Sequence, residues 1–235
     1  MNREELPCYG EIVTLDFYKL RSLDFQPTVI FDIGANLGLF TTFAHELFPY
    51  SWIVAIEPHP ANFAFLYENT PKADNIVRLN KALGSGQVLR YPDVQGTEES
   101  PLVTGETYIT AMPGYNLPKV GEHPMFPVDT EAVMLDELYW DYVVPGQKTI
   151  VKIDCEGAEN VLFAHEPSMA ALRQAEFITM ELHPYWATRE YGKWAEGQQE
   201  ETDEELASRV TAMLEDTHDC ISEPPMFYAR RRHAE

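Results

Sequence analysis

The sequence predicts an α/β fold built on a doubly wound, mostly parallel sheet. Apolar runs suited to buried strands alternate with segments whose apolar residues recur at helical spacing. Several of these strands end in an acidic residue, and turns that contain glycine lead from strand to helix. The chain has 235 residues, of which 45% are hydrophobic, so it can bury one sizeable core. We therefore expect a single domain over residues 1–235.

The first strand and its turn lie between Val29 and Gly38. Val29–Phe31 is a short apolar run, as expected for a strand that is covered on both faces. Asp32 stands where the strand ends, and Gly34 and Gly38 allow the backbone to turn sharply and to approach a ligand closely. Apolar residues at helical spacing then predict a helix that ends near Leu47.

The second strand, Trp52–Ile56, ends in Glu57. A glycine turn that is followed about 20 residues later by an acid at a strand end is typical of sites for nucleoside cofactors. In such sites the acid binds the hydroxyl groups of the ribose. This combination of strand, turn, helix, strand and acid indicates a nucleoside cofactor.

The remaining elements are expected in the following order. Residues 1–27 should form a helical extension before the first strand. Later elements are a helix over 61–67, a strand over 75–79, a turn at 84–86, a helix over 131–139, a strand over 149–154, a helix over 158–164, a strand over 177–182, a helix over 204–215 and a closing strand around Phe227 and Tyr228. The strand–helix series implies parallel strands with right-handed crossovers.

Residues 92–127 interrupt this alternation with an irregular or β-rich insertion. The segment is rich in Gly, Pro, Thr and Glu, and Thr107–Thr110 is its one strand-like piece. An insertion of this length within a domain is more often a functional loop than a linker. We interpret residues 92–127 as a candidate lid, and the alternative is a surface excursion that does not contact the site.

The composition of the chain argues against several classes of binding partner. The net charge of −21 argues against nucleic acid, because binding to phosphates requires clustered Lys and Arg. No apolar run approaches the roughly 20 residues that span a membrane, so no membrane partner is expected. The three cysteines are widely spaced, which argues against a disulfide framework and for a reducing, cytoplasmic location.

A second informative segment runs from Lys152 to Glu159. Its strand places Asp154 at a carboxyl end, where ligands bind in open α/β sheets. Lys152, in the middle of this strand, is expected to pair with a neighbouring acid rather than to contact substrate. Four acids at successive strand ends would line one crevice and would suit a ligand with hydroxyl groups and positive charge: Asp32, Glu57, Asp154 and Glu181.

Structural interpretations of the same residues stay open. Asp32 could serve only to accept backbone N–H bonds from the turn that follows it. Glu156 and Glu159 could simply favour the amino end of the next helix through its dipole. His183, just before Pro184, is either a loop histidine with ordinary partners or an acid–base group.

Three segments resemble the signatures of the FkbM family: FDIGANLGLFT (31–41), IEPHPANF (56–63) and VKIDCEGAE (151–159). Members of this family are class I methyltransferases that use S-adenosylmethionine and act mostly on hydroxyl groups. The resemblance spans roughly residues 28–184 and implies a Rossmann-like class I methyltransferase sheet. Residues 92–127 cannot be aligned with the family pattern, so the identity of the acceptor stays open.

The resemblance also implies the roles of individual residues. The cofactor-binding set would be Asp32, Gly34, Ala35, Asn36, Gly38, Glu57, Pro58 and Ala82, with S-adenosylmethionine as the cofactor. Asp154 and Glu156 would lie beside the reacting methyl group. The acceptor would be a hydroxyl of a small molecule or glycan, and we expect His183 or Asp154 to act as the base that takes its proton. We assign no metal ligand.

Three rival functions share parts of this pattern. A nicotinamide-dependent oxidoreductase would use the glycine turn and the ribose acid, but the Gly34–Gly38 spacing does not match G-x-G-x-x-G. A metal-dependent hydrolase could use Asp154, Glu156, Glu181 and His183 with Mg²⁺ or Mn²⁺. A protein without catalytic activity could bind the cofactor for structural reasons. The sequence decides neither the acceptor nor the oligomeric state.

Overall fold

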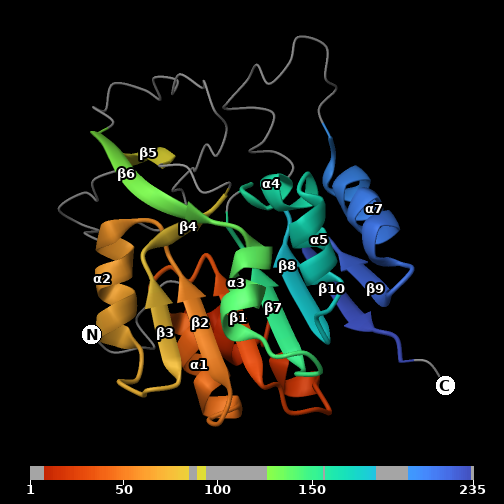
Figure 1. The fold of residues 1–235 in the computed structure, drawn as a ribbon, viewed down its shortest axis with the longest axis horizontal. Helices are drawn as coiled ribbons and strands as arrows, with labels where there is room; N and C mark the ends of the chain where they lie inside the picture. Colours follow the sequence, from red (N-terminus) through yellow and green to blue (C-terminus); the bar gives the residue numbers. More distant parts are fainter. Residues whose placement is uncertain (1–7, 85–88, 94–125, 156, 184–200, 234–235) are drawn as a thin grey trace.

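A seven-stranded sheet forms the centre of the computed structural model, which describes residues 8–84, 89–93, 126–155, 157–183 and 201–233 (Figure 1). The strands lie in the order β3-β2-β1-β7-β8-β10-β9. Five of them are parallel, namely β1 (Val29–Ile33), β2 (Trp52–Ile56), β3 (Ile76–Leu79), β7 (Thr149–Ile153) and β8 (Phe177–Glu181), and an antiparallel pair, β10 (Met226–Arg231) and β9 (His218–Glu223), completes one side. The predicted fold class is confirmed.

The direction of strand addition reverses between β1 and β7. From β1 the chain continues to β2 and β3 on one side, whereas β7 leads to β8 on the other side. The register places Asp32 of β1 directly beside Lys152 of β7. In open α/β sheets such a reversal opens a crevice at the carboxyl ends of the strands, and ligands bind there.

Helices cover both faces of the sheet because the central strands are apolar on both sides (Figure 1). Phe31 belongs to a core with α3 (Leu135–Tyr142), α5 (Glu166–Leu172) and α7 (Asp203–Leu214). Ile30 belongs to the core on the opposite face, where α1 (Leu39–Leu47) packs. Two further helices follow strands in the chain: α2 (Pro60–Asn69) comes after β2, and α4 (Glu159–Phe163) comes after β7. Each large side chain that is fully buried in this way contributes roughly 1.5–3 kcal/mol.

The segment before β1 packs on the face that α1 covers. It contains a π-helical turn at Gly10–Thr14 and a 3₁₀ turn at Leu20–Ser22. The rings of Tyr18 and Phe40 meet edge to face, with centroids 5.2 Å apart. This packing carries Tyr18 to the carboxyl ends of β1 and β7.

The structure contains a second, three-stranded sheet, which includes part of a segment predicted to be helical. Its strands are β4 (Lys81–Leu83), β6 (Phe126–Val133) and β5 (Leu89–Asp93), in that order. The helix predicted over 131–139 is wrong at its start, because residues 131–133 pair with β4. Helix α3 begins only at Leu135. The side chain of Glu137, in the first turn of this helix, accepts a hydrogen bond from the Met134 N–H and caps the helix start.

The ends of the predicted insertion lie in this small sheet, where Pro92 of β5 stands opposite Pro127 of β6. Residues 94–125, including Thr107–Thr110, lie outside the described part of the chain. The sequence does not predict α5 or β9. None of the described helices is both long enough and apolar enough to cross a lipid bilayer.

Candidate active site

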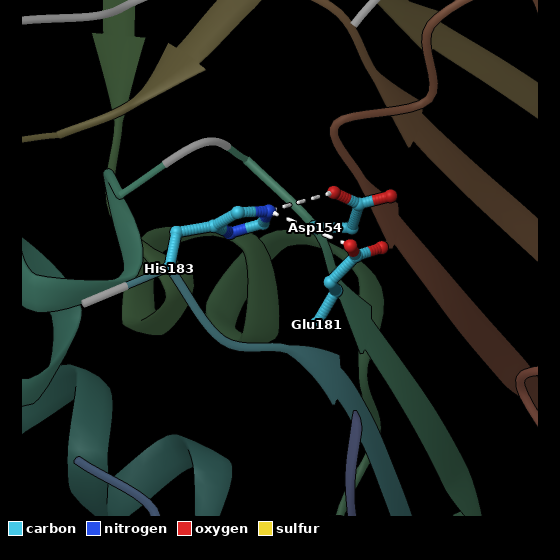
Figure 2. Close-up of side chains that lie close together, drawn as sticks. All are labelled: Asp154, Glu181 and His183. Atoms are coloured by element: carbon cyan, nitrogen blue, oxygen red, sulfur yellow. Dashed lines mark ion pairs between the residues drawn. The ribbon is translucent and has the colours of Figure 1, made fainter. Parts of the chain in front are cut away.

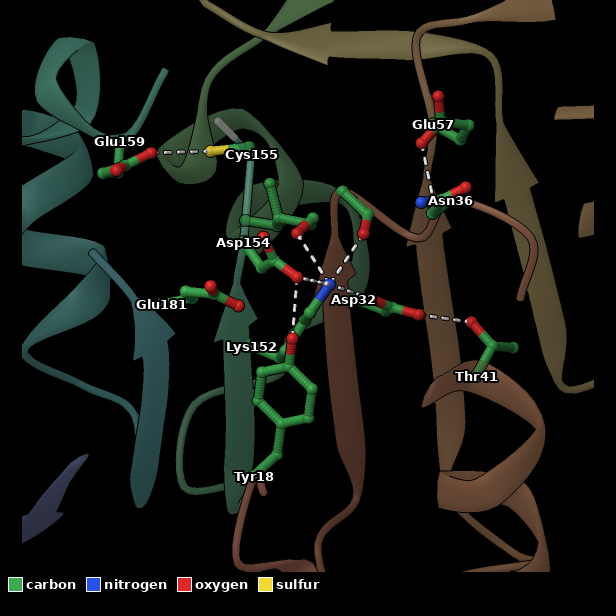
Figure 3. A network of polar contacts seen from close by, with 12 residues as sticks. Tyr18, Asp32, Asn36, Thr41, Glu57, Lys152, Asp154, Cys155, Glu159 and Glu181 are labelled. Atoms are coloured by element: carbon green, nitrogen blue, oxygen red, sulfur yellow. Dashed lines mark hydrogen bonds and ion pairs between the residues drawn. The ribbon is translucent and has the colours of Figure 1, made fainter. Parts of the chain in front are cut away.

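The turn after β1 is the structural centre of the site (Figure 3). Gly34 has φ +77°, and a Cβ at this position would lie 1.8 Å from the carbonyl oxygen of Asp154. Asn36 and Gly38 also have positive φ angles, +47° and +88°. Only glycine can therefore occupy position 34, where the β1 turn crosses the end of β7.

The ammonium group of Lys152 connects the turn after β1 to the carboxyl groups of Asp32 and Asp154. Its Nζ lies 3.1 Å from Asp32 Oδ1 and donates to the carbonyl oxygen of Gly34 at 2.6 Å. Asp154 Oδ2 lies 3.6 Å from the same nitrogen. Burial lowers the pKa of Lys152, but the charges of Asp32 and Asp154 outweigh it, so the pKa is raised and the side chain stays charged. The expectation that Lys152 pairs with a neighbouring acid is confirmed.

Asp32 is fully buried beneath the turn. Besides the ion pair with Lys152, its Oδ2 accepts a hydrogen bond from the hydroxyl of Thr41 in α1 at 2.6 Å. These two partners tie β1, α1 and β7 together. Asp32 thus supports the turn indirectly. It binds the Thr41 hydroxyl and the Lys152 ammonium group, and not the backbone N–H groups of the turn.

Glu57 lies at the end of β2 and is held by backbone donors. Its two oxygens accept hydrogen bonds from the N–H groups of Asn36 and His59, each at 2.9 Å. The side-chain nitrogen of Asn62 lies 3.5 Å from Oε1. Burial raises the pKa of Glu57 to about 7, although these donors oppose the change.

Asp154 follows β7 and faces the cavity, with 24% of its side chain exposed. The hydroxyl of Tyr18 donates to Asp154 Oδ2 at 2.7 Å (Figure 3). Burial and then the charge of Asp154 raise the pKa of Tyr18, so this phenol remains a donor. No local sequence signal indicates Tyr18, because it precedes Asp154 by 136 positions.

His183 and Glu181 approach Asp154 from the end of β8 (Figure 2). His183 Nε2 lies 3.9 Å from Asp154 Oδ1 and 3.9 Å from Glu181 Oε1. Burial and then the charge of Asp154 raise the pKa of Glu181, and His183 opposes this. One ligand atom from each of these three residues lies within 4.8 Å of the others, an arrangement that could hold a divalent cation.

Glu159, the first residue of α4, is buried behind this group. Its Oε1 accepts from the His183 N–H at 2.9 Å, and His183 Nδ1 lies 3.2 Å away. Its Oε2 accepts from the Gly157 N–H at 2.9 Å and from the Cys155 thiol at 3.4 Å. Burial and then Glu159 raise the pKa of Cys155, which keeps the thiol protonated and unsuited to nucleophilic attack.

Two adjoining cavities open along the carboxyl ends of the strands. A cavity of ≈ 210 Å³ reaches from Asp154 to Glu57 and Asn62, and one of ≈ 350 Å³ lies beneath Tyr18 and Phe40. Both are lined by Gly34, Asn36, Glu11, Asp154 and Glu181. Their shared wall therefore carries three carboxyl groups, which suits a positively charged ligand.

Two buried amide oxygens lie near Glu57 without a hydrogen-bond partner in the described part of the chain. They are Asn36 Oδ1 and Asn62 Oδ1. A buried polar atom without a partner costs roughly 1–3 kcal/mol. Both residues line the smaller cavity, so a ligand with hydroxyl or amine donors would relieve this cost.

The sequence-predicted residues fall into four groups. His183 contacts Asp154 and Glu159 but is not among the described residues that line the two cavities. Those that line the cavities are Gly34, Ala35, Asn36, Glu57, Pro58 and Asp154. Asp32 supports the turn and Gly38 begins α1, and the side chain of Ala82 packs against Ala132 and Val161 while its neighbours Lys81 and Leu83 line the smaller cavity. Glu156 lies outside the described residues. Sequence reasoning did not identify Tyr18 and Asn62 as site residues.

Comparisons with known proteins agree on one enzyme class. The model of the methyltransferase FkbM domain matches residues 32–216. A 31-O-demethyl-FK506 methyltransferase FkbM from Streptomyces tacrolimicus is 42% identical over 91 residues, which cover 36% of this chain and 35% of that protein. Methyltransferase sdnD from Sordaria araneosa is 26% identical over 168 residues, 64% of each chain. The chain thus spans about a third of the length of the first relative and just under two thirds of the length of the second.

Among solved structures, the chain is similar to a fibrillarin pre-rRNA processing protein from Methanococcus jannaschii. The two are 12% identical, and the TM-score is 0.47. The superposition covers 94% of this chain and 76% of that one.

Proposed function

Because the chain belongs to the FkbM methyltransferase family, we propose that it transfers the methyl group of S-adenosylmethionine to a hydroxyl oxygen of a sugar, glycan or secondary metabolite. The methyltransferase class itself follows from a family match that covers most of the chain. The cofactor and the hydroxyl acceptor are our proposal. The observation that carries it is the continuous cavity from Glu57 to Asp154, across the glycine turn.

The residues of this cavity fit the cofactor. Gly34 lines both cavities at the point where the turn crosses the end of β7, and Glu57 offers a carboxylate to the ribose hydroxyls. The amide oxygens of Asn36 and Asn62, which lack partners in the described part of the chain, would accept hydrogen bonds from hydroxyl or amine groups. Glu11, Asp154 and Glu181 would favour the positive charge of a sulfonium.

When bound, S-adenosylmethionine supplies a methyl group that is already activated by its positively charged sulfur. The chain must then orient the acceptor and remove the proton of its hydroxyl. Correct orientation can lower a barrier by roughly 7–11 kcal/mol. A well-placed base adds about 10²–10⁴-fold.

His183 and Asp154 are the proposed bases. Nε2 of His183 and Oδ1 of Asp154 lie 3.9 Å apart, so one acceptor oxygen could reach both (Figure 2). Asp154 is oriented by the Tyr18 hydroxyl on its other oxygen, which leaves Oδ1 on the side of His183. The three acids that line both cavities disfavour acceptors with phosphate or carboxylate groups.

A transfer screen with isotopically labelled methyl groups tests the proposal. Purified protein and methyl-labelled S-adenosylmethionine are incubated with panels of sugars, glycans, polyketides and small phenols, and products are identified by mass spectrometry and NMR. We expect label in an O-methyl group, and far less product from Asp154→Asn in the same time. Products labelled on nitrogen or carbon would contradict hydroxyl methylation, and cofactor binding without any transfer would favour a non-catalytic role.

A further inference from the structure

Glu159 is a buried carboxylate that joins the ends of two adjacent strands. It is fully buried, and both of its oxygens accept backbone hydrogen bonds. Oε2 binds the N–H of Gly157, in the turn after β7, and Oε1 binds the N–H of His183, after β8. A buried carboxylate needs such donors, so they fix its position. The same oxygen that binds the His183 backbone lies 3.2 Å from the ring nitrogen Nδ1.

This geometry distinguishes the two nitrogens of the imidazole. An ionised carboxylate only accepts hydrogen bonds, so Nδ1 satisfies Glu159 Oε1 when it carries the proton. In the neutral ring the lone pair then lies on Nε2. Nε2 is the nitrogen that faces Asp154 and Glu181 (Figure 2). Glu159 therefore favours the tautomer whose basic nitrogen points toward Asp154 and Glu181, two residues that line both cavities.

We propose that Glu159 is a positioning residue that holds His183 in the Nδ1–H tautomer, with Nε2 directed at the acceptor oxygen. The inference rests on the proposed hydroxyl methylation. The hydroxyl proton passes to Nε2, and the positive charge that this creates on the ring is balanced by Glu159 at Nδ1. A carboxylate behind a catalytic histidine plays this part in hydrolytic triads.

Several other charged groups surround the ring. Asp154 faces it from the end of β7 and itself pairs with Lys152, and Glu181 faces it from the end of β8. Asp154 and Glu181 lie on the Nε2 side, where they cannot orient Nδ1. Glu159 alone among the described carboxyl groups is in hydrogen-bond range of Nδ1. A purely structural role, in which Glu159 only links the two strand ends, predicts no preference between tautomers.

NMR of the histidine nitrogens separates the two roles without any acceptor. The protein has seven histidines, and labelling them with ¹⁵N while comparing the spectra of wild type and His183→Gln assigns the His183 resonances. At a pH where the ring is neutral, long-range ¹H–¹⁵N spectra show which nitrogen is protonated. We expect Nδ1–H in the wild type and in Glu159→Gln, whose amide oxygen still accepts, and a mixture or Nε2–H in Glu159→Ala.

Cys155→Ala is the matched control, because it removes a donor to Oε2 and leaves the Oε1 contacts intact. It should keep the wild-type tautomer. An Nε2–H ring in the wild type, or an unchanged tautomer in folded Glu159→Ala, would overturn the proposal. If Glu159→Ala does not fold, the wild-type, Glu159→Gln and Cys155→Ala spectra still decide whether Nδ1 carries the proton.

A kinetic measurement separates this inference from the proposed function. With an acceptor found in the screen, Glu159→Ala should lose about 10²-fold or more in kcat, and Glu159→Gln should recover part of it. The Kd for S-adenosylmethionine should stay within a few fold in both variants. If no acceptor is found, the proposed function fails while the tautomer result stands on its own.

Discussion

The ammonium group of Lys152 donates a hydrogen bond to the carbonyl oxygen of Gly34, at 2.6 Å, across the junction between β7 and β1. The same nitrogen forms an ion pair with the buried Asp32. One cation therefore holds both the turn and the acid beneath it. The shape of the proposed cofactor loop depends on this contact between strands that are far apart in the sequence.

Replacing Lys152 by Met should destabilise the fold by about 3–5 kcal/mol, because it leaves the carboxylate of Asp32 buried without a cation. Urea denaturation measures the change in the free energy of unfolding. Lys148→Met, at an exposed lysine just before β7, should have little effect. Asp32→Asn combined with Lys152→Met should recover part of the loss. Equal effects of Lys152→Met and Lys148→Met would contradict this role.

S-adenosylmethionine and S-adenosylhomocysteine should raise the melting temperature, and NAD should not. A ligand at 100 times its Kd stabilises the fold by about 2.7 kcal/mol. A thermal-shift assay with the three ligands measures this. Asn62→Ala should weaken the response, because it removes an acceptor that lines the smaller cavity. Stabilisation by NAD alone would refute the proposed cofactor.

The raised pKa of Glu57 predicts how stability depends on pH. The folded protein keeps this proton up to about pH 7, whereas a free glutamate loses it near 4.5. The unfolded state thus binds fewer protons between these values, so the free energy of unfolding falls as the pH rises across the window. Glu57→Gln should flatten this slope, by up to roughly 3 kcal/mol over the window. Parallel profiles for the two proteins in urea denaturation would contradict the prediction.

The charge of Glu57 should also control affinity for the cofactor. An ionised carboxylate is the stronger acceptor for ribose hydroxyls, so binding should tighten as the pH rises through about 7. Isothermal titration calorimetry with S-adenosylhomocysteine measures the dependence. Glu57→Gln should bind more weakly and lose the pH dependence. A wild-type affinity that is constant across this range would argue against ribose binding by Glu57.

Asp154→Asn and His183→Gln should each reduce kcat by about 10²–10⁴-fold, because each removes a proposed base. The Kd for S-adenosylmethionine should change by no more than a few fold. Steady-state kinetics together with calorimetry separates the two effects. Loss of cofactor binding in a folded variant would instead assign that residue to the cofactor subsite.

Methyl transfer should survive treatment with EDTA, because the proposed mechanism assigns proton removal to side chains and activation to the sulfonium. Turnover is measured before and after chelation, and again after Mg²⁺ or Mn²⁺ is added. A loss that either ion restores would assign Asp154, Glu181 and His183 to a divalent cation.

The parallel strands and the acids at their ends are visible in the sequence, because they arise from local patterns. β1 and β2 are apolar runs that stop at Asp32 and Glu57, and the structure places both acids at the carboxyl edge of the sheet. The start of α3 is not visible in this way. Apolar residues at helical spacing predict a helix over 131–139, yet residues 131–133 pair with β4, which lies about 50 positions earlier. β9 carries mostly exposed residues, so no apolar alternation indicates it.

The candidate site likewise contains some residues that local sequence patterns indicate and others that they do not. The glycine turn, Glu57 and Asp154 belong to short motifs, so their proximity can be inferred from strand order. The hydrogen bond from the Tyr18 hydroxyl to Asp154 and the one from the His183 N–H to Glu159 depend on packing between distant segments. No spacing rule relates such pairs, and only the folded chain reveals them.

The hydrogen bond between Tyr18 and Asp154 has a practical consequence for protein engineering. A shortened chain that starts after Tyr18 would keep every strand of the sheet and still lose a direct partner of Asp154. Soluble expression of such a fragment would therefore be a poor guide to its activity. β10 is antiparallel to β8, so Arg231 lies at the edge of the sheet opposite the cavities. An affinity tag or fusion partner belongs after Arg231, where it stays away from the cavities.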